Sequence, residues 1–362
     1  MALTGDCADL GNAEVSHEQI VATISPKIQQ LIVLPTEKCN FRCTYCYEDF
    51  KIGKMPEWVQ TGLERFMDKR IPELSFFSLQ WFGGEPLLAK SVVLRLSKYA
   101  NDLCTRHGVH IAGSITTNAY LLEQALFAEL VSYGQRFYQI TLDGVAEDHD
   151  TKRRLANGGG TFERIWRNLV ATRSVDEQFI IQMRIHARRD NRESLKTLVR
   201  QIAATFGDDP RYQMDFQHLR DLGGEGGKTV SQPLSIPEVR ELERELRAEH
   251  AAALQARRAE AGLTPHDALP AHDGLVAEII DGPRREPVDI CYAAKPNSLL
   301  IRADGRVGKC TVALTDDRNT VGTLNADGTV TIDSERLKPW IRGLSTLDVG
   351  ELSCPLGGMY SG

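Results

Sequence analysis

Short apolar runs alternate with longer amphipathic stretches along the first 220 residues of the chain. Six runs have the length and composition of strands: Gln30–Pro35, Phe76–Phe82, His110–Thr117, Phe137–Leu142, Phe179–His186 and Tyr212–His218. Five stretches between them resemble helices: Pro56–Arg70, Ser91–His107, Leu122–Tyr133, Phe162–Val175 and Arg192–Phe206. This alternation predicts a parallel sheet with helices outside it, joined by right-handed crossovers. The fold class is therefore α/β, a partial (β/α)6 TIM-like barrel, because a closed eight-unit barrel takes about 250 residues.

The pattern changes after the sixth strand run. Leu222–Gly227 reads LGGEGG, which predicts a flexible break, and Ser235–Glu238 predicts the start of a charged helix that Gly262 would end. In the last 72 residues, short apolar runs at Ser298–Arg302 and Thr329–Ile332 lie among Asp-Gly turns, which predicts a small β-rich domain. The predicted organisation is an N-terminal extension (1–28), the barrel (29–220), a helical connector (221–290) and a C-terminal domain (291–362).

The composition narrows the class of protein. Apolar residues make up 42% and charged residues 25% of the 362 residues, which is ordinary for a soluble globular chain. No apolar window is long enough to span a bilayer, and the first residues lack a secretory signal. The net charge of −6, with acids and bases interspersed, argues against a nucleic-acid groove. We therefore predict a cytoplasmic protein with neither a nucleic-acid nor a membrane partner.

The eight cysteines point to two sites. Cys39, Cys43 and Cys46 form CxxxCxxC directly after the first strand run, and Cys291, Cys310 and Cys354 lie in the C-terminal part. Loops at the carboxyl ends of barrel strands are where active sites are built. Three thiolates on such a loop can hold three irons of a [4Fe–4S] cluster and leave the fourth open. Zinc would need a fourth ligand, and a trio of buried structural thiols is the remaining alternative.

The first cysteine loop resembles the CxxxCx-aromatic-C signature of the radical S-adenosylmethionine (radical SAM) enzymes, with Tyr45 in the aromatic position. The resemblance continues at three further strand ends and covers roughly residues 28–220. These are Trp81–Pro86 (WFGGEP), Thr116–Asn118 (TTN) and Thr141–Gly144 (TLDG), the last followed by His149, Asp150 and Arg153.

This resemblance implies that the open iron of a [4Fe–4S] cluster binds S-adenosylmethionine and that one electron releases a 5′-deoxyadenosyl radical. The backbone of the two glycines in GGEP would approach the ammonium of the methionine end. Arg153, or Arg184 on the fifth strand run, would pair with its carboxylate, while Tyr45 and Asn118 would hold the adenosine. The full set implied for this cofactor is Tyr45, Gly83, Gly84, Glu85, Asn118, Thr141, Arg153 and Arg184. The electron would come from a reductase or a flavodoxin-type donor.

The second set of cysteines has the spacing C-x13-G-x4-C, from Cys291 through Gly305 to Cys310. It resembles the opening of the SPASM/twitch auxiliary-cluster domain of peptide-modifying radical SAM enzymes. Only Cys354 follows, so the resemblance implies one auxiliary [4Fe–4S] cluster rather than two. The alternative is a small domain with three unrelated thiols.

The resemblance favours a ribosomally made precursor peptide as substrate, and three reactions compete. Oxidative crosslinking of side chains ranks first, with a carbon–carbon bond to an aromatic ring (a cyclophane) ahead of a thioether. A formylglycine-type sulfatase maturase usually carries an Asp where Thr311 follows Cys310, and an epimerase needs a thiol that only Cys7 or Cys104 could supply. An iron–sulfur electron-transfer or scaffold protein is the non-enzymatic alternative, but it gives no reason for GGEP and TTN at successive strand ends.

Two further expectations concern the base that takes the substrate's proton and the way a precursor peptide is recognised. Bond formation to an aromatic ring leaves a proton to be removed, and Asp215 in the sixth strand run and Asp143 after the fourth are the candidate bases. Only about 28 residues precede the first strand run, so we expect leader recognition, if any, to use the barrel surface, the connector or a separate protein.

Overall fold

The computed structural model describes residues 20–21, 23–207, 209–260 and 290–360, and it contains the predicted barrel elements. The strands are β1 (Ile28–Val33), β3 (Phe76–Trp81), β4 (His110–Thr117), β5 (Gln135–Leu142), β7 (Ile180–Ala187) and β8 (Tyr212–His218). The helices between them are α2 (Glu57–Arg70), α3 (Lys90–His107), α4 (Gln124–Ser132), α6 (Phe162–Thr172) and α7 (Arg192–Phe206). Apolar periodicity therefore located all of these elements to within a few residues.

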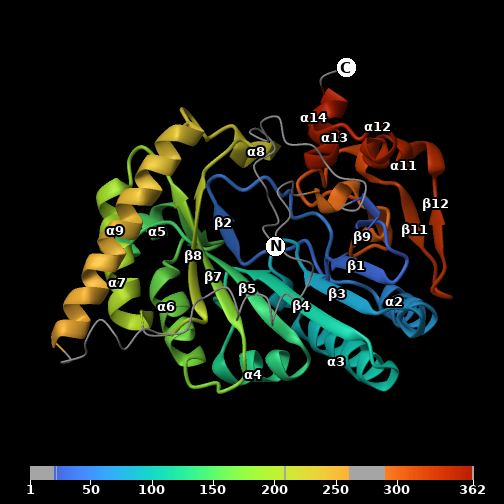
Figure 1. Ribbon diagram of the computed structural model, residues 1–362, viewed down its shortest axis with the longest axis horizontal. Helices are drawn as coiled ribbons and strands as arrows, with labels where there is room; N and C mark the ends of the chain where they lie inside the picture. Colours follow the sequence, from blue (N-terminus) through green and yellow to red (C-terminus); the bar gives the residue numbers. More distant parts are fainter. Residues whose placement is uncertain (1–19, 22, 208, 261–289, 361–362) are drawn as a thin grey trace.

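The barrel strands form one curved sheet in the order β1-β3-β4-β5-β7-β8, and every neighbouring pair is parallel. Figure 1 shows the helices packed outside the curve. The outer face of the strands is apolar: Trp81 donates a hydrogen bond to Ser97 of α3, and Tyr138 packs on Phe127 of α4. The predicted α/β partial barrel is confirmed.

The opposite face of the same strands, called the inner face below, is polar. Side chains alternate across a strand, so the residues between the outward ones point into the curve. Most of them are polar, including Ser78, Gln80, Gln139, Thr141, Gln182, Arg184, His186, Gln213, Asp215 and Gln217. A sheet that turns a polar face inward is shaped to surround a polar ligand rather than a hydrophobic core.

The C-terminal strands continue the barrel sheet. They are β9 (Ser298–Ile301), β10 (Arg306–Gly308), β11 (Gly322–Leu324) and β12 (Val330–Ile332). β9 pairs in parallel with β1, and β10, β11 and β12 follow it in antiparallel order, which makes a sheet of ten strands. Short helices end the described chain: α11 (Ser334–Ile341), α12 (Gly343–Thr346), α13 (Val349–Ser353) and α14 (Pro355–Tyr360). The C-terminal region is β-rich as predicted, but it shares the sheet of the barrel.

The segment after β8 contains the predicted charged helix but differs from the flexible break that we expected. Gly224–Gly227 forms a short helix, α8, and α9 (Ile236–Glu260) packs along α7, as Figure 1 shows. Ion pairs Arg189–Glu238, Lys196–Glu245 and Arg200–Glu249, at 2.7 to 2.9 Å, join this segment to α7 and the turn before it. The charged residues of this helix thus face the barrel as well as solvent.

Residues 1–19 and 261–289, with Cys7 and the predicted helix stop at Gly262, lie outside the described residues. No helix in the described ranges has the length and apolarity needed to cross a bilayer.

Candidate functional site

The CxxxCxxC loop leaves the carboxyl end of β1 and is shaped by two strands that the sequence did not reveal. β2 (Phe41–Cys43) pairs in antiparallel fashion with β6 (Arg153–Leu155), and Cys43 lies opposite Arg153. The thiols of Cys39, Cys43 and Cys46 are free and half-buried. Burial raises the pKa of all three, to about 12 for Cys46, and Glu85 and the other two cysteines raise that of Cys39 further. The three thiols therefore influence one another, and each would need a bound cation to persist as a thiolate.

The donor set of this loop fits a cluster better than a single ion. Within the described ranges, no three His, Cys, Asp or Glu side chains converge on one point that an ion could fill. Zinc needs four ligands at about 2.0–2.3 Å from a single centre. Three thiols spread along one loop, with an arginine opposite the middle one, match three cluster ligands with one iron left open. Cys39, Cys43 and Cys46 would therefore hold such a cluster.

A buried hydrogen-bond network connects the cysteine loop to the barrel strands. The Tyr45 hydroxyl donates to Asp143 Oδ2 at 2.6 Å, and Arg153 Nη1 donates to the same hydroxyl at 2.8 Å. His186 Nδ1 lies 3.1 Å from Asp143 Oδ1, and its ring meets that of Tyr45 edge-on. The aromatic side chain of the motif is thus fixed from β5, β6 and β7 together.

Asp143 is fully buried, and both of its carboxylate oxygens are engaged in this network. Burial alone would raise its pKa, but the hydrogen bond and charge of His186 and the charge of Arg153 outweigh burial and hold the pKa below its ordinary value. A carboxylate with so low a pKa and no free oxygen is a weak proton acceptor. The geometry therefore disfavours Asp143 as the base and favours a role in orienting His186.

Glu85 joins the loops that follow three strands. Its buried carboxylate accepts hydrogen bonds from Thr117 Oγ1 and Asn118 N, both at 2.7 Å, and from Leu87 N at 2.9 Å. Its backbone N–H donates to Lys38 O at 3.0 Å, in the loop after β1. Asn118 in turn donates to Asn40 Oδ1 at 2.9 Å. Side chains from three separate motifs are therefore held at one edge of the sheet.

The two glycines of GGEP lie against this same loop. A Cβ atom on Gly83 would stand 2.3 Å from Thr36 O, and its φ of +116° is one that glycine alone adopts easily. A Cβ atom on Gly84 would stand 2.6 Å from the carbonyl oxygens of Glu37 and Lys38. We expected these glycines to permit the approach of a ligand; in the structure they already permit the approach of the cysteine loop itself.

Two buried arginines have spare donors: Arg184 on the inner face and Arg153 on β6. Arg184 Nε pairs with Asp215 Oδ2 at 3.1 Å across β7 and β8, and Thr141 is the register partner of Arg184 on β5. Arg184 Nη2 and Arg153 Nε are buried and have no hydrogen-bond partner in the described residues. Unpaired buried guanidinium donors are costly, so these positions favour an anionic ligand such as a carboxylate.

The C-terminal cysteines also form a neighbourhood. Cys291 N donates to Leu352 O at 2.9 Å, which holds Cys291 beside the segment that carries Cys354. Burial raises the pKa of Cys310, and nearby Cys354 raises it further. Burial and the charges of Cys310 and Cys291 raise the pKa of Tyr292. Its hydroxyl forms a 2.8 Å hydrogen bond with the Thr311 hydroxyl. Cys291, Cys310 and Cys354 therefore lie in one region of the C-terminal part.

Cys104 lies apart from both sets. It is fully buried in α3, and burial raises its pKa to about 12, as expected for a core thiol.

Two features of the site were not found from the sequence. His186 lies two positions after Arg184 on the same strand and therefore on the same inner face, so strand alternation could have indicated His186. The buried pair Glu37–Arg302, with N–O distances of 2.8 and 2.6 Å, joins the loop after β1 to the end of β9. Because its partners are 265 positions apart, no local pattern indicates it.

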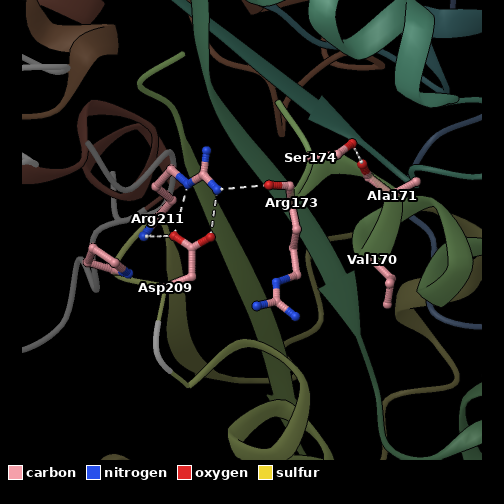
Figure 2. Close-up of a pocket in the computed structure, with 7 residues that line it drawn as sticks. Val170, Ala171, Arg173, Ser174, Asp209 and Arg211 are labelled. Atoms are coloured by element: carbon pink, nitrogen blue, oxygen red, sulfur yellow. Dashed lines mark hydrogen bonds and ion pairs between the residues drawn. The ribbon is translucent and has the colours of Figure 1, made fainter. Parts of the chain in front are cut away.

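Two surface cavities in the described part of the chain lie away from the cysteine loop. The larger, about 650 Å³, is an open hollow at the amino end of β8, where Figure 2 shows Arg211 bonded to Asp209 and Arg173. The smaller, about 230 Å³, lies between the carboxyl half of β8 and α9 and includes Asp215. Only the smaller one reaches a residue of the inner face.

Residues 33–201 match the model of the radical SAM superfamily. An Fe-coproporphyrin III synthase of Methanosarcina barkeri is 25% identical over 209 residues, which are 57% of this chain and 47% of that protein. A GTP 3′,8-cyclase of Campylobacter jejuni is 31% identical over 137 residues, 36% of this chain and 39% of that protein. The matches span less than half the length of either relative.

Two solved structures share the fold over most of the chain. Native anSMEcpe with bound AdoMet and Cp18Cys peptide superposes with a TM-score of 0.57 at 18% identity, covering 86% of this chain and 80% of that one. Streptococcus suis SuiB bound to precursor peptide SuiA gives 0.55 at 14% identity, with 92% and 72% covered. Both likenesses concern the fold, the α/β sheet described above.

Proposed function

We propose that this chain is a radical SAM enzyme that oxidises a ribosomally made peptide. The observation that carries the proposal is the CxxxCxxC loop, held at the carboxyl edge of a parallel sheet beside two buried arginines with spare donors. Bound there, the cluster and S-adenosylmethionine would supply a 5′-deoxyadenosyl radical that takes a hydrogen atom from the substrate. Cys39, Cys43 and Cys46 hold the cluster, and Arg184, with Arg153, holds the carboxylate of the methionine end.

The test is reductive cleavage of S-adenosylmethionine by the anaerobically reconstituted protein. The unaltered chain is expected to form 5′-deoxyadenosine, and the Cys39/Cys43/Cys46 triple Ala variant is expected to lose about four irons and all cleavage. Cys104→Ala is the matched control, because that thiol is buried in α3 away from the loop. Cleavage by the triple variant would refute the assignment, and clusters without cleavage in the unaltered chain would favour an electron-transfer or scaffold protein.

The C-terminal cysteines are proposed to hold one auxiliary [4Fe–4S] cluster. Crosslinking removes two electrons and two protons for each bond: one hydrogen atom leaves with the 5′-deoxyadenosyl radical, and an electron and a proton must leave separately. An auxiliary cluster is a suitable acceptor for that electron. Intact protein is expected to bind about eight irons, and the Cys291/Cys310/Cys354 triple Ala variant about four, with cofactor cleavage retained. Four irons in fully reconstituted intact protein would refute the second cluster.

A peptide substrate is supported by fold likeness to two proteins whose structures contain peptides. Crosslinking, first to an aromatic carbon and next to sulfur, ranks ahead of the other reactions for two reasons in this chain. Thr311 is buried against Tyr292 where a maturase-type Asp would stand, and Cys104 is too deeply buried to return a hydrogen atom in an epimerisation. A flavodoxin-type donor or reductase, a separate leader-binding protein and a cytoplasmic location complete the proposal.

The proton of the oxidised substrate is proposed to pass to His186. Its Nδ1 is tied to the buried Asp143 carboxylate, which leaves Nε2 as the ring nitrogen that can accept. Asp215 stays the second candidate, with its carboxylate shared between Arg184 and Gln217. Asp143 then acts as a positioning residue rather than as the base.

A further inference from the structure

The glycine-rich segment after β8 contacts the cysteine loop directly, although about 180 residues separate them in sequence. Gly226 N–H donates to Cys46 O at 3.2 Å. The Thr229 hydroxyl lies 3.0 Å from Thr44 O and 2.8 Å from Gly226 O. Two backbone carbonyls, on either side of Tyr45, are therefore held from one short segment.

This contact is too close for any side chain. A Cβ atom on Gly226 would stand 2.2 Å from Cys46 O and 2.4 Å from Cys46 N, and both are backbone atoms that cannot swing aside. A Cβ atom on Gly224 would stand 2.5 Å from Tyr47 O, and its φ of +68° lies in the left-handed region that favours glycine. Gly224 and Gly226 thus serve close packing against the loop rather than flexibility.

The segment is fixed at its ends as well. Asp221 Oδ1 accepts from Gly223 N at 2.8 Å, and Arg189, in the turn after β7, bonds to Gln232 O at 3.1 Å and pairs with Glu238. A segment tied on both sides can transmit a defined position to the loop that it touches. Within the described residues, the first half of the cysteine loop packs on Gly83, Gly84 and Glu85. The half that carries Cys46 is held through the Tyr45 hydroxyl and Thr44 N, and its backbone at Cys46 packs on this segment.

We propose that Gly224, Gly226 and Thr229 are positioning residues for Cys46. Their backbone and hydroxyl contacts hold the Cys46 carbonyl and cover the second half of the loop, so that the Cys46 thiol keeps its place before any cluster binds. The positioning of the thiol is argued from these contacts alone. Its purpose, binding a cluster, rests on the proposed function.

The test follows the reactivity of individual thiols in the metal-free, reduced full-length protein. Alkylation of Cys46 and Cys39 by a maleimide is measured by peptide mass spectrometry, and the ratio of the two rates is the readout. Gly226→Ala is expected to raise the Cys46-to-Cys39 ratio about tenfold, because the clash frees one half of the loop only. Gly53→Ala is the matched control, since a Cβ atom there meets nothing within 4 Å.

Thr229→Val keeps the proposal testable if Gly226→Ala folds poorly, because it removes the hydroxyl without adding a backbone clash. It is expected to raise the ratio about two- to threefold, with the urea midpoint of the whole protein unchanged. Unaltered ratios in both variants would overturn the proposal. After reconstitution, Gly226→Ala is expected to lose iron to a chelator faster than Gly53→Ala. If neither the variants nor the unaltered protein binds iron but the alkylation ratios still change, the proposed function fails and the positioning role stands.

Discussion

Replacing Arg302 tests whether one buried ion pair fastens the C-terminal strands to the loop after β1. Its guanidinium makes two hydrogen bonds to Glu37, at 2.8 and 2.6 Å, and a third to Leu314 O at 2.7 Å. Both side chains are buried, with exposed fractions of 8% and 2%. Removing one partner of such a pair leaves an uncompensated charge and destabilises a protein by about 3–5 kcal/mol.

We expect the loss of Arg302 to cost more stability than the loss of Glu37, because of the charges around the pair. Burial, together with the charge of Glu37, raises the pKa of neighbouring Glu48 to about 8, while the charge of Arg302 acts to lower it. Arg302→Met would therefore leave two carboxyl groups in a buried space without a cation, whereas Glu37→Gln leaves Arg302 bonded to Leu314 O. We expect Arg302→Met to lower the free energy of unfolding by about 3–5 kcal/mol and Glu37→Gln by about 2 kcal/mol.

The assay is anaerobic urea unfolding of the metal-free protein, for the two single variants and the double variant. The loss of unfolding free energy in the double variant is expected to be at least about 1 kcal/mol smaller than the two single losses added together, because both uncompensated charges are removed at once. Arg306→Met is the matched control: Arg306 forms a half-exposed pair with Asp304 on the same hairpin and should cost less than about 1 kcal/mol. Equal losses for Arg302→Met and Arg306→Met, or strictly additive effects in the cycle, would refute the reasoning.

Three further predictions use other parts of the site. Burial and Arg153 lower the pKa of His149 to about 4, so its contribution to stability is complete above the ordinary pKa of 6.5 and is lost as the pH falls. From pH 7 to pH 5, wild type should lose about 2 kcal/mol more than His149→Gln in urea unfolding, and parallel pH profiles would contradict this. Gly305→Ala should destabilise the protein by about 1–3 kcal/mol more than Gly158→Ala, since both positions have positive φ but only at Gly305 does a Cβ atom stand 2.5 Å from the Trp58 ring. His186→Gln should keep 5′-deoxyadenosine formation and lose about 10²-fold or more in peptide product, with a changed pH profile, and an unaltered product rate would exclude His186 as the base.

The barrel was predictable because its information is local. Each strand carries an apolar outer face for the helices, and period-two and period-3.6 patterns are visible within ten or so residues. The same alternation placed Arg184 and Asp215 on one face. The ligand motifs were also local, since each is a few residues at the end of one strand.

What the sequence could not provide depends on contacts between distant segments. β2 and β6 are three residues long, too short for a periodic signal, yet they set Cys43 opposite Arg153. The LGGEGG segment was misjudged because glycine permits both flexibility and close packing, and only the neighbouring Cys46 backbone decides between them. The partners of Asp143 were likewise not visible locally: its position after a strand suggested an available carboxylate, and both of its oxygens bond to Tyr45 and His186.

The shared sheet gives the two cysteine sets a fixed relation. β9 is parallel to β1, so the chain segments that follow these strands leave the same edge side by side, with Glu37 on one and Arg302 on the other. The first segment leads to Cys39, Cys43 and Cys46, and β9 and its hairpin lead to Cys310. A domain on a flexible tether could not keep such an arrangement, whereas adjacent hydrogen-bonded strands locked by a buried ion pair can. Under the proposed function, weakening the Glu37–Arg302 pair should therefore lower formation of the crosslinked product more than cofactor cleavage, which would use the first cysteine set alone.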